Sequence, residues 1–205
     1  MRNASFVLAV ALFAAVPASA RDRDHRELRV VPAIFDPGGT HAIISRWTPF
    51  SGPGRSDPAI IMAKILPTSA DAAAVATVEG VRGLVLDELG FDVFAGGHCG
   101  AGAPRFNVVM SNDGLHFVGC AAGPSTGTLT DSRGATWTRK RWTATDLANG
   151  ALASPPITAA SGTVIRISIV FDEGADTGPD FTGQTFLDNI DINGTLIRKP
   201  GLAKP

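Results

Sequence analysis

The chain contains no tyrosine, and only two cysteines, three methionines and three tryptophans, among its 205 residues. Without tyrosine, lyase chemistry that uses a tyrosine side chain as acid and base is excluded. Charged residues make up only 18% of the chain and the formal net charge is −1, so the charge balance does not favour nucleic acid or an anionic membrane surface as a partner. No stretch after the N-terminal region approaches the ~20 apolar residues that cross a bilayer.

Several patterns typical of enzymes are also missing. No Gly-x-Ser-x-Gly elbow occurs, which removes the usual setting of a serine nucleophile. The four histidines do not have the spacing of a zinc site. Glu88 and Asp92 lie about four residues apart on one face of a predicted strand, too far for the two carboxylates of a retaining glycosidase. We therefore expect a protein without enzymatic activity.

The N-terminal residues have the pattern of a secretory signal peptide. Arg2 supplies a positive charge, residues 6–16 form an apolar run, and Ala18-Ser19-Ala20 match a cleavage site. We expect residues 1–20 to be removed and the protein to be secreted or periplasmic.

The remaining chain is long enough to bury one sizeable core. We expect a charged leader over residues 21–27, a single domain over residues 28–198 and a flexible tail over residues 199–205. The expected protein is a monomer without a membrane span.

Cys99 and Cys120 are the only cysteines. Oxidising compartments pair thiols that the cytosol keeps reduced, so two cysteines in an exported chain predict one disulfide. The alternative is a reactive Cys99 thiol beside His98, as in a thiol enzyme.

The pattern of apolar residues predicts an all-β protein. Short alternating or fully apolar stretches are separated by Gly- and Pro-rich turns, which favours an antiparallel β-sandwich of jelly-roll type. Pro32 predicts an edge position for the first strand. Residues 69–80 suit either a helix or a strand. Strands are expected over residues 28–35, 41–47, 59–66, 83–94, 105–110, 115–120, 136–143, 164–172 and 184–192.

A hairpin is predicted between the two cysteines. If residues 111–114 form a four-residue turn, strict alternation puts one apolar set on the core face and a second set outside. The core set is Phe106, Val108, Met110, Leu115 and Phe117. The outer set includes Asn107 and His116.

The closing strand contains a conflict at Asp188. Alternation places Asp188 on the core face with Phe186 and Ile190, and an unpaired buried carboxylate is costly. Calcium binds carboxylates and loop carbonyls, so Asp188 is a candidate calcium ligand, with Asp36 and its turn as a second source of oxygens. The alternative is a carboxylate that accepts backbone N–H groups or lies at the sandwich rim.

Two segments resemble the end of galactose-binding-like jelly rolls, the fold of many carbohydrate-binding modules of secreted bacterial proteins. They are Phe171-Asp172-Glu173-Gly174 and Leu187-Asp188-Asn189-Ile190. The run from Cys99 to Val108 is also similar to an element of exported bacterial sandwich proteins. The resemblance covers residues 28–198 loosely. It implies a non-enzymatic module that binds glycan or cell-surface carbohydrate, with a structural calcium at the position of Asp188.

Sugar recognition needs an exposed aromatic ring and nearby polar groups. Trp142 is the platform candidate, because it shares its strand face with polar side chains, and Arg105, Asn107 and His116 could line the same site. In the alternative interpretation, the three tryptophans belong to the core and the polar residues form a solvated sheet face. The function would then be that of a structural or adhesive surface protein, with an extracellular polysaccharide-active enzyme as a third class.

Overall fold

The computed structural model describes residues 27–53, 58–65, 71–100, 102–172 and 183–197. These residues form two antiparallel sheets packed face to face, which confirms the all-β sandwich and is compatible with a jelly roll. The predicted signal peptide, nearly all of the charged leader and the tail over residues 199–205 lie outside the described residues.

The first sheet, sheet A, has five strands within the described residues. Their order is β1 (Arg29–Phe35), β4 (Ala73–Glu79), β10 (Val164–Phe171), β6 (Arg105–Met110) and β7 (Gly114–Gly119). β1 is an edge strand, as Pro32 predicts.

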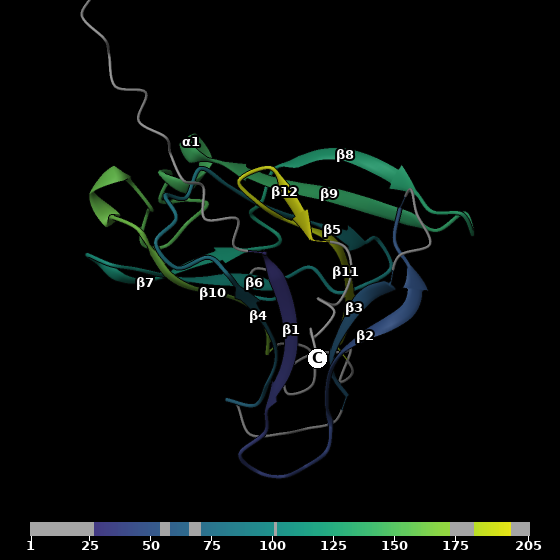
Figure 1. Cartoon of the computed structure of the whole chain (residues 1–205). Helices are drawn as coiled ribbons and strands as arrows, with labels where there is room; N and C mark the ends of the chain where they lie inside the picture. The colour runs from purple at the N-terminus through teal and green to yellow at the C-terminus, as the bar shows by residue number, and fades with distance from the viewer. Residues whose placement is uncertain (1–26, 54–57, 66–70, 101, 173–182, 198–205) are drawn as a thin grey trace, which may run out of the picture.

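The second sheet, sheet B, has seven described strands. Six follow the order β2 (Ile43–Ser51), β3 (Pro58–Lys64), β11 (Gly183–Ile192), β5 (Glu88–Phe94), β9 (Thr136–Thr143) and β8 (Ser125–Thr130), and β12 (Thr195–Ile197) pairs with β11. Two short helices, α1 (Ala144–Leu147) and the 3-10 helix η1 (Ala159–Ser161), lie between β9 and β10. In Figure 1 strands β8, β9 and β5 lie above β7, β10 and β6.

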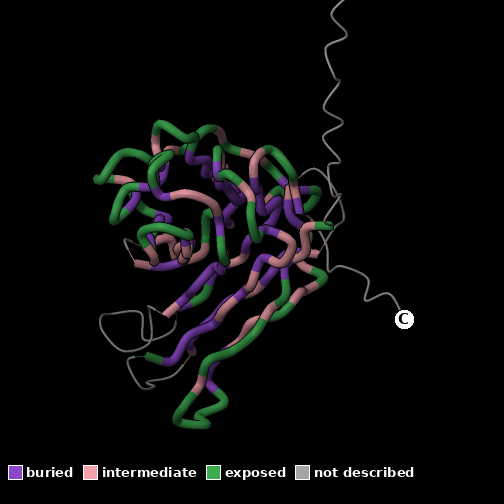
Figure 2. Tube along the Cα trace, turned by 60° about the vertical axis from the view of Figure 1, so that its left-hand side comes forward, coloured by how far each residue is buried: buried purple, intermediate pink, exposed green. Residues whose placement is uncertain are grey.

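The core lies between the two sheets. Leu89, Phe91 and Val93 of β5 are buried and belong to it, whereas Glu88 and Asp92 point to the other face of sheet B, as alternation predicts. The tube in Figure 2 shows central strands that are mostly buried, while the connecting turns and the edge strands β1 and β8 carry exposed residues.

Three local predictions are settled by the structure. Residues 69–80, which suited a helix or a strand, contain strand β4. The strand expected from residue 83 begins only at Glu88. The Ser, Thr and Gly content of residues 124–134 predicts a loop, but this segment contains the edge strand β8, which is held by its pairing with β9.

The closing strand departs from strict alternation. The register of β11 against β5 shifts between Asp188 and Asp191, and Asn189 has a positive φ of 46°. This β-bulge reverses the faces, so that Leu187 and Ile190 point into the core while Asp188 does not. The prediction that Asp188 lies on the core face with Phe186 and Ile190 is therefore wrong.

The hairpin between β6 and β7 is also displaced by one residue from its predicted register. Met110 pairs with Gly114, not with Leu115, because the loop has three residues and Gly114 has a φ of 87°. The shift turns every side chain of β7 over. His116 is thus buried, and Phe117, predicted in the core, is exposed.

Candidate ligand-binding pocket

A pocket of about 400 Å³ lies along the outer edge of β7. Its walls come from three parts of the chain, namely the loop before β6, the strand β7 with the turn that follows it, and the segment after α1. Figure 1 shows that last segment, in green, beside β7. The lining residues are Gly102, Arg105, Phe117, Gly119, Ala122, Gly150, Ala151, Leu152, Ala153 and Ser154.

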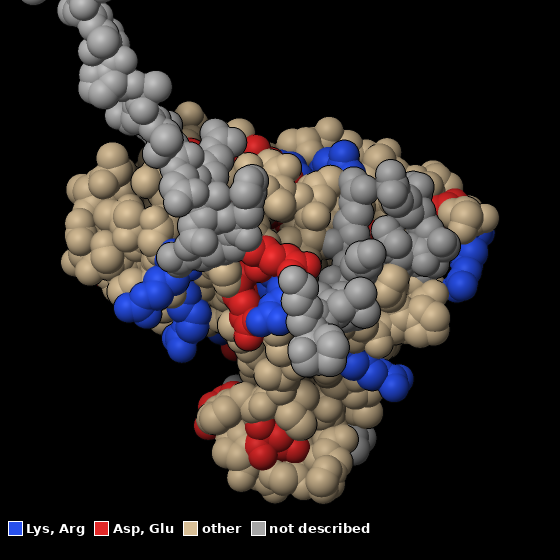
Figure 3. All heavy atoms as spheres, in the orientation of Figure 1, with Lys and Arg blue, Asp and Glu red and all other residues tan. Residues whose placement is uncertain are grey.

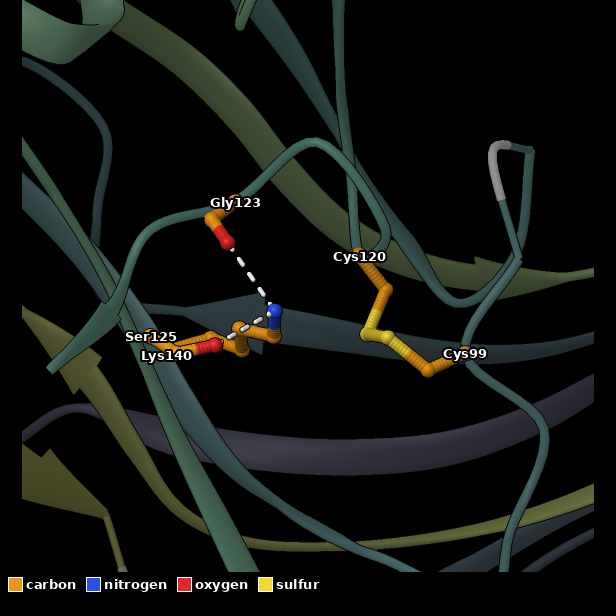
Figure 4. Close-up of a disulfide and its surroundings, with 5 residues drawn as sticks. All are labelled: Cys99, Cys120, Gly123, Ser125 and Lys140. Carbon is orange, nitrogen blue, oxygen red and sulfur yellow. Dashed lines mark hydrogen bonds between the residues drawn. A yellow bond between two sulfur atoms is a disulfide. The ribbon is translucent and has the colours of Figure 1, made fainter. Parts of the chain in front are cut away.

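A disulfide joins the first two walls. Cys99 and Cys120 are bonded, with 5.3 Å between their Cα atoms, as Figure 4 shows. The Ala121 amide also donates to the Gly100 carbonyl, at 3.0 Å. The predicted disulfide is confirmed, and the alternative of a reactive Cys99 thiol is wrong because both cysteines are bonded.

The turn after Cys120 is held from inside the sandwich by Lys140. Its buried Nζ donates to the Gly123 carbonyl at 2.9 Å and to Ser125 Oγ at 3.0 Å (Figure 4). Burial lowers the pKa of Lys140. A Cβ on Gly123 would lie 2.1 Å from the Trp142 ring, so only glycine lets this turn pack so closely on the indole.

Arg105 is the charged side chain of the pocket. Its guanidinium forms two parallel bonds to the Asp172 carboxylate, at 2.6 and 2.7 Å, and also donates to the Gly102 carbonyl and to Asn107 Oδ1. These bonds use four of its N–H groups, and the fifth, on Nη2, has no acceptor among the described residues. The bidentate pair fixes the guanidinium plane at the pocket wall.

Phe117 supplies the aromatic surface of the pocket. The Arg105 guanidinium carbon lies 5.5 Å from its ring centroid, and the residue is 40% exposed. The sequence prediction missed Phe117 because it assumed a four-residue turn. Gly114, placed after Asn-Asp, was the signal for a three-residue loop, which would have turned Phe117 outward.

The third wall is tied to β7 by backbone and side-chain bonds. Phe117 and Ser154 exchange two backbone hydrogen bonds of 2.9 Å each. The next residue, Pro155, places its carbonyl 2.9 Å from His116 Nδ1. The wall is therefore an extension of sheet A rather than a loose loop.

Two of the four predicted ligand residues are at this pocket, and two are not. Arg105 lines it, and Asn107 bonds to Arg105 from the same strand. His116 is 0% exposed and lies behind the pocket wall. Trp142 is 0% exposed and contacts the rings of Phe91 and Phe106 in the core, so its interpretation as an exposed platform is wrong.

The other two tryptophans also serve packing. Trp137 is fully buried on the outer side of sheet B, where its Nε1 donates to Asp131 Oδ2 and its ring meets those of Phe50 and Phe94. Trp47 is half-buried against the core and donates to the Val30 carbonyl.

Asp188 lies in a row of charged groups on the outer face of sheet B. It stands opposite Asp92, a buried carboxylate that accepts two bonds from Arg139 and one from Asn189 Nδ2. Asp188 Oδ1 accepts a hydrogen bond of 2.7 Å from the backbone N–H of Asn189. A Cβ on Gly52 would lie 1.8 Å from Asp188 Oδ2, so the carboxylate packs directly against that glycine.

Asp36, the second predicted calcium ligand, closes its own turn after β1. Its carboxylate accepts bonds from Thr40 Oγ1 and from the His41 amide. No group of three or more histidine, cysteine or acidic side chains able to hold a metal ion occurs among the described residues. Calcium at Asp188 stays a prediction, because carbonyl oxygens can also bind calcium.

On the face shown in Figure 3, acidic residues gather at the centre around a basic group and again at the lower end, while other basic residues lie to the left and right. In the described part of the chain, no helix is long and apolar enough to cross a membrane.

Comparison of the chain with models of protein families, with curated proteins and with solved structures found no match.

Proposed function

We propose that this protein is an exported, non-enzymatic module that binds a saccharide of a glycan or cell-surface polysaccharide at the pocket beside β7. The observation that carries the proposal is the exposed ring of Phe117 next to the Arg105–Asp172 pair. A saccharide has apolar C–H faces that pack on rings and hydroxyl groups that need donors and acceptors.

A sugar hydroxyl both accepts and donates hydrogen bonds. The remaining N–H of Arg105, which lines the pocket, donates to a sugar oxygen, and the Asp172 carboxylate, which Arg105 binds beside the lining, is the acceptor for a sugar hydroxyl. Because Arg105 and Asp172 neutralise each other, the pocket favours neutral sugars over strongly charged ones. The disulfide and the Phe117–Ser154 pairing hold these groups in place before a ligand arrives.

The signal-peptide pattern and the disulfide both support export to an oxidising compartment. An exported module meets polysaccharides at the cell surface.

The test is a glycan array followed by calorimetric titration of each retained saccharide. Replacing Phe117 with Ala removes the ring, and we expect affinity to fall roughly tenfold or more. The matched control is Leu115→Ala, which removes an exposed apolar side chain of the same strand that does not line the pocket. A folded protein that retains no saccharide on the array, or an equal loss in both variants, would contradict the proposal.

A structural or adhesive surface protein without a small-molecule site is the second candidate. The complete burial of Trp137 and Trp142 favours it, because neither ring is left to act as a platform. The array separates the two functions, since an adhesive protein of this kind binds no isolated saccharide.

A further inference from the structure

The backbone of Gly119, the last residue of β7, lines the pocket. In an antiparallel pair of strands, successive residues point their N–H and C=O groups alternately toward the partner strand and away from it. Phe117 exchanges both of its backbone hydrogen bonds with Ser154, on the side of β7 away from β6. Gly119 lies two residues further along β7, so its N–H and C=O point to the same free edge, on the side of the pocket.

The segment that would continue sheet A at this edge turns away before it reaches Gly119. The pairing of Phe117 with Ser154 is antiparallel, so a continued strand would place Leu152 opposite Gly119. The Leu152 amide instead donates to the Asn149 carbonyl at 2.9 Å. In the part of the chain that the structure describes, the Gly119 N–H and C=O therefore have no hydrogen-bond partner.

The two free groups of Gly119 define what a ligand must carry. An extended residue presents its N–H and C=O on one side, so the matching ligand has an acceptor and a donor next to each other. An N-acetylated amino sugar has this pair, because its amide N–H and the hydroxyl oxygen of the next ring carbon are neighbours. The amide N–H donates to the Gly119 carbonyl, and the hydroxyl oxygen accepts from the Gly119 N–H.

The other lining residues suit the methyl group and the charge of an acetamido group. Ala122 and Ala151 line the pocket, and both are exposed. A hydroxyl group finds no hydrogen-bond partner in such side chains, whereas a methyl group that packs on them is removed from water. The acetamido group is neutral, which fits a pocket in which Arg105 and Asp172 neutralise each other.

We propose that the pocket binds the acetamido group of an N-acetylated hexosamine, with the backbone of Gly119 as its donor and acceptor. The inference rests on the proposed function, because it names the class of saccharide that the same site takes. An extended peptide also carries neighbouring N–H and C=O groups. However, Ser154 already occupies the edge at Phe117 and β7 ends at Gly119, so an added strand would pair with one residue only. The free edge is therefore long enough for a sugar but not for a strand.

The test measures amide hydrogen exchange by NMR in the whole folded protein, without ligand and with N-acetylglucosamine. At about ten times its dissociation constant the sugar leaves roughly a tenth of the sites free, so exchange of the Gly119 amide should slow about tenfold. The Leu115 amide is the matched control, because it points to the same edge of β7 but lies outside the pocket, and its exchange should not change. The Phe117 amide should be protected in both states, since it bonds to Ser154.

A calorimetric titration compares the affinities of two matched sugars. Glucose differs from N-acetylglucosamine only at the acetamido group, and we expect it to bind at least about tenfold more weakly. An unprotected Gly119 amide in the saturated protein, or a glucose affinity equal to or above that of N-acetylglucosamine, would overturn the inference and leave the proposed function standing.

Two further outcomes are decisive. Tighter binding of an N-acetylated dipeptide amide than of either sugar would assign the free edge to a peptide and overturn the inference. If no saccharide is retained on the glycan array, the proposed function fails, and this inference fails with it.

Discussion

Arg141 is one of the charged residues on the outer face of sheet B, with Asp92 and Asp191. Its side chain lies across Gly90, where a Cβ would come within 2.3 Å of Arg141 Cδ, and its Nε reaches Asp191 at 3.1 Å on the next strand. The missing side chain at position 90 is what lets the guanidinium cross β5. Asp191 Oδ1 is buried and accepts no hydrogen bond within the described residues.

Glu88 lies beside this group. Burial, and then the neighbouring Asp191 carboxylate, raise the pKa of Glu88. A raised pKa in the folded state means that Glu88 contributes stability below its unfolded pKa, and that this contribution is lost as pH rises through the folded pKa. The contribution of Glu88 to the free energy of unfolding should therefore fall on going from acid to neutral pH.

Glu88→Gln is expected to stabilise the protein at neutral pH, because the amide removes the repulsion and can donate to Asp191 Oδ1. The gain should stay below about 1 kcal/mol, since the Glu88 side chain is 35% exposed and solvent screens the pair. Urea unfolding at several pH values measures it, and the difference from wild type should vanish at acid pH.

The control at the residue scale is Glu79→Gln, which removes the partner of Arg29 at the surface and should not stabilise the protein. If Glu88→Gln is destabilising at neutral pH, the attraction to Arg141 outweighs the repulsion by Asp191 and the prediction fails.

At the scale of elements, the β6–β7 hairpin depends on one glycine. Gly114 has a φ of 87°, and a Cβ added there would contact no other atom. An alanine at this position would therefore cause backbone strain but no steric clash. Gly114→Ala should lower the free energy of unfolding by about 1–2 kcal/mol, the cost of a left-handed conformation in a residue with a Cβ. Urea denaturation curves measure the difference.

Gly127 of β8 is the matched control. It also has open space around it but lacks a positive φ, so Gly127→Ala should be neutral or slightly stabilising. Equal effects of the two substitutions would show that the hairpin loop does not require its positive φ.

These two elements also show where sequence reasoning stops. The alternation on β5 and β9 is correctly predicted, because successive side chains of a regular strand point to opposite faces and the apolar set faces the core. On β7 and β11 one extra or missing residue reverses the faces, and that residue is set by φ at Gly114 and at Asn189. For this reason the sequence analysis placed Phe117 in the core and Asp188 on the core face, and both predictions are wrong.

At the scale of the whole molecule, the disulfide closes a stretch with a sequence separation of 21 between the two cysteines. Replacing Cys99 and Cys120 together with alanine should lower stability by about 3 kcal/mol, mainly because the unfolded chain gains freedom. Urea denaturation of the double variant should match that of the wild-type protein treated with a reductant. Equal midpoints for the variant and the oxidised wild type would contradict this expectation.

The sequence by itself determined the fold class and the disulfide. Alternating apolar residues predict strands, and two cysteines in a chain with a signal-peptide pattern predict a disulfide. Both signals can be recognised in the sequence without knowledge of the tertiary contacts.

Only the tertiary structure decided which side chains form the pocket. Its walls come from segments around residues 102, 117 and 152, which are distant in the sequence and meet because β7 is the edge of sheet A. The register of β7 exposed the Phe117 ring, whereas Trp142 is buried because its face of β9 points into the core. Both outcomes depend on loop geometry and on long-range pairing, whose free energies a local pattern does not contain.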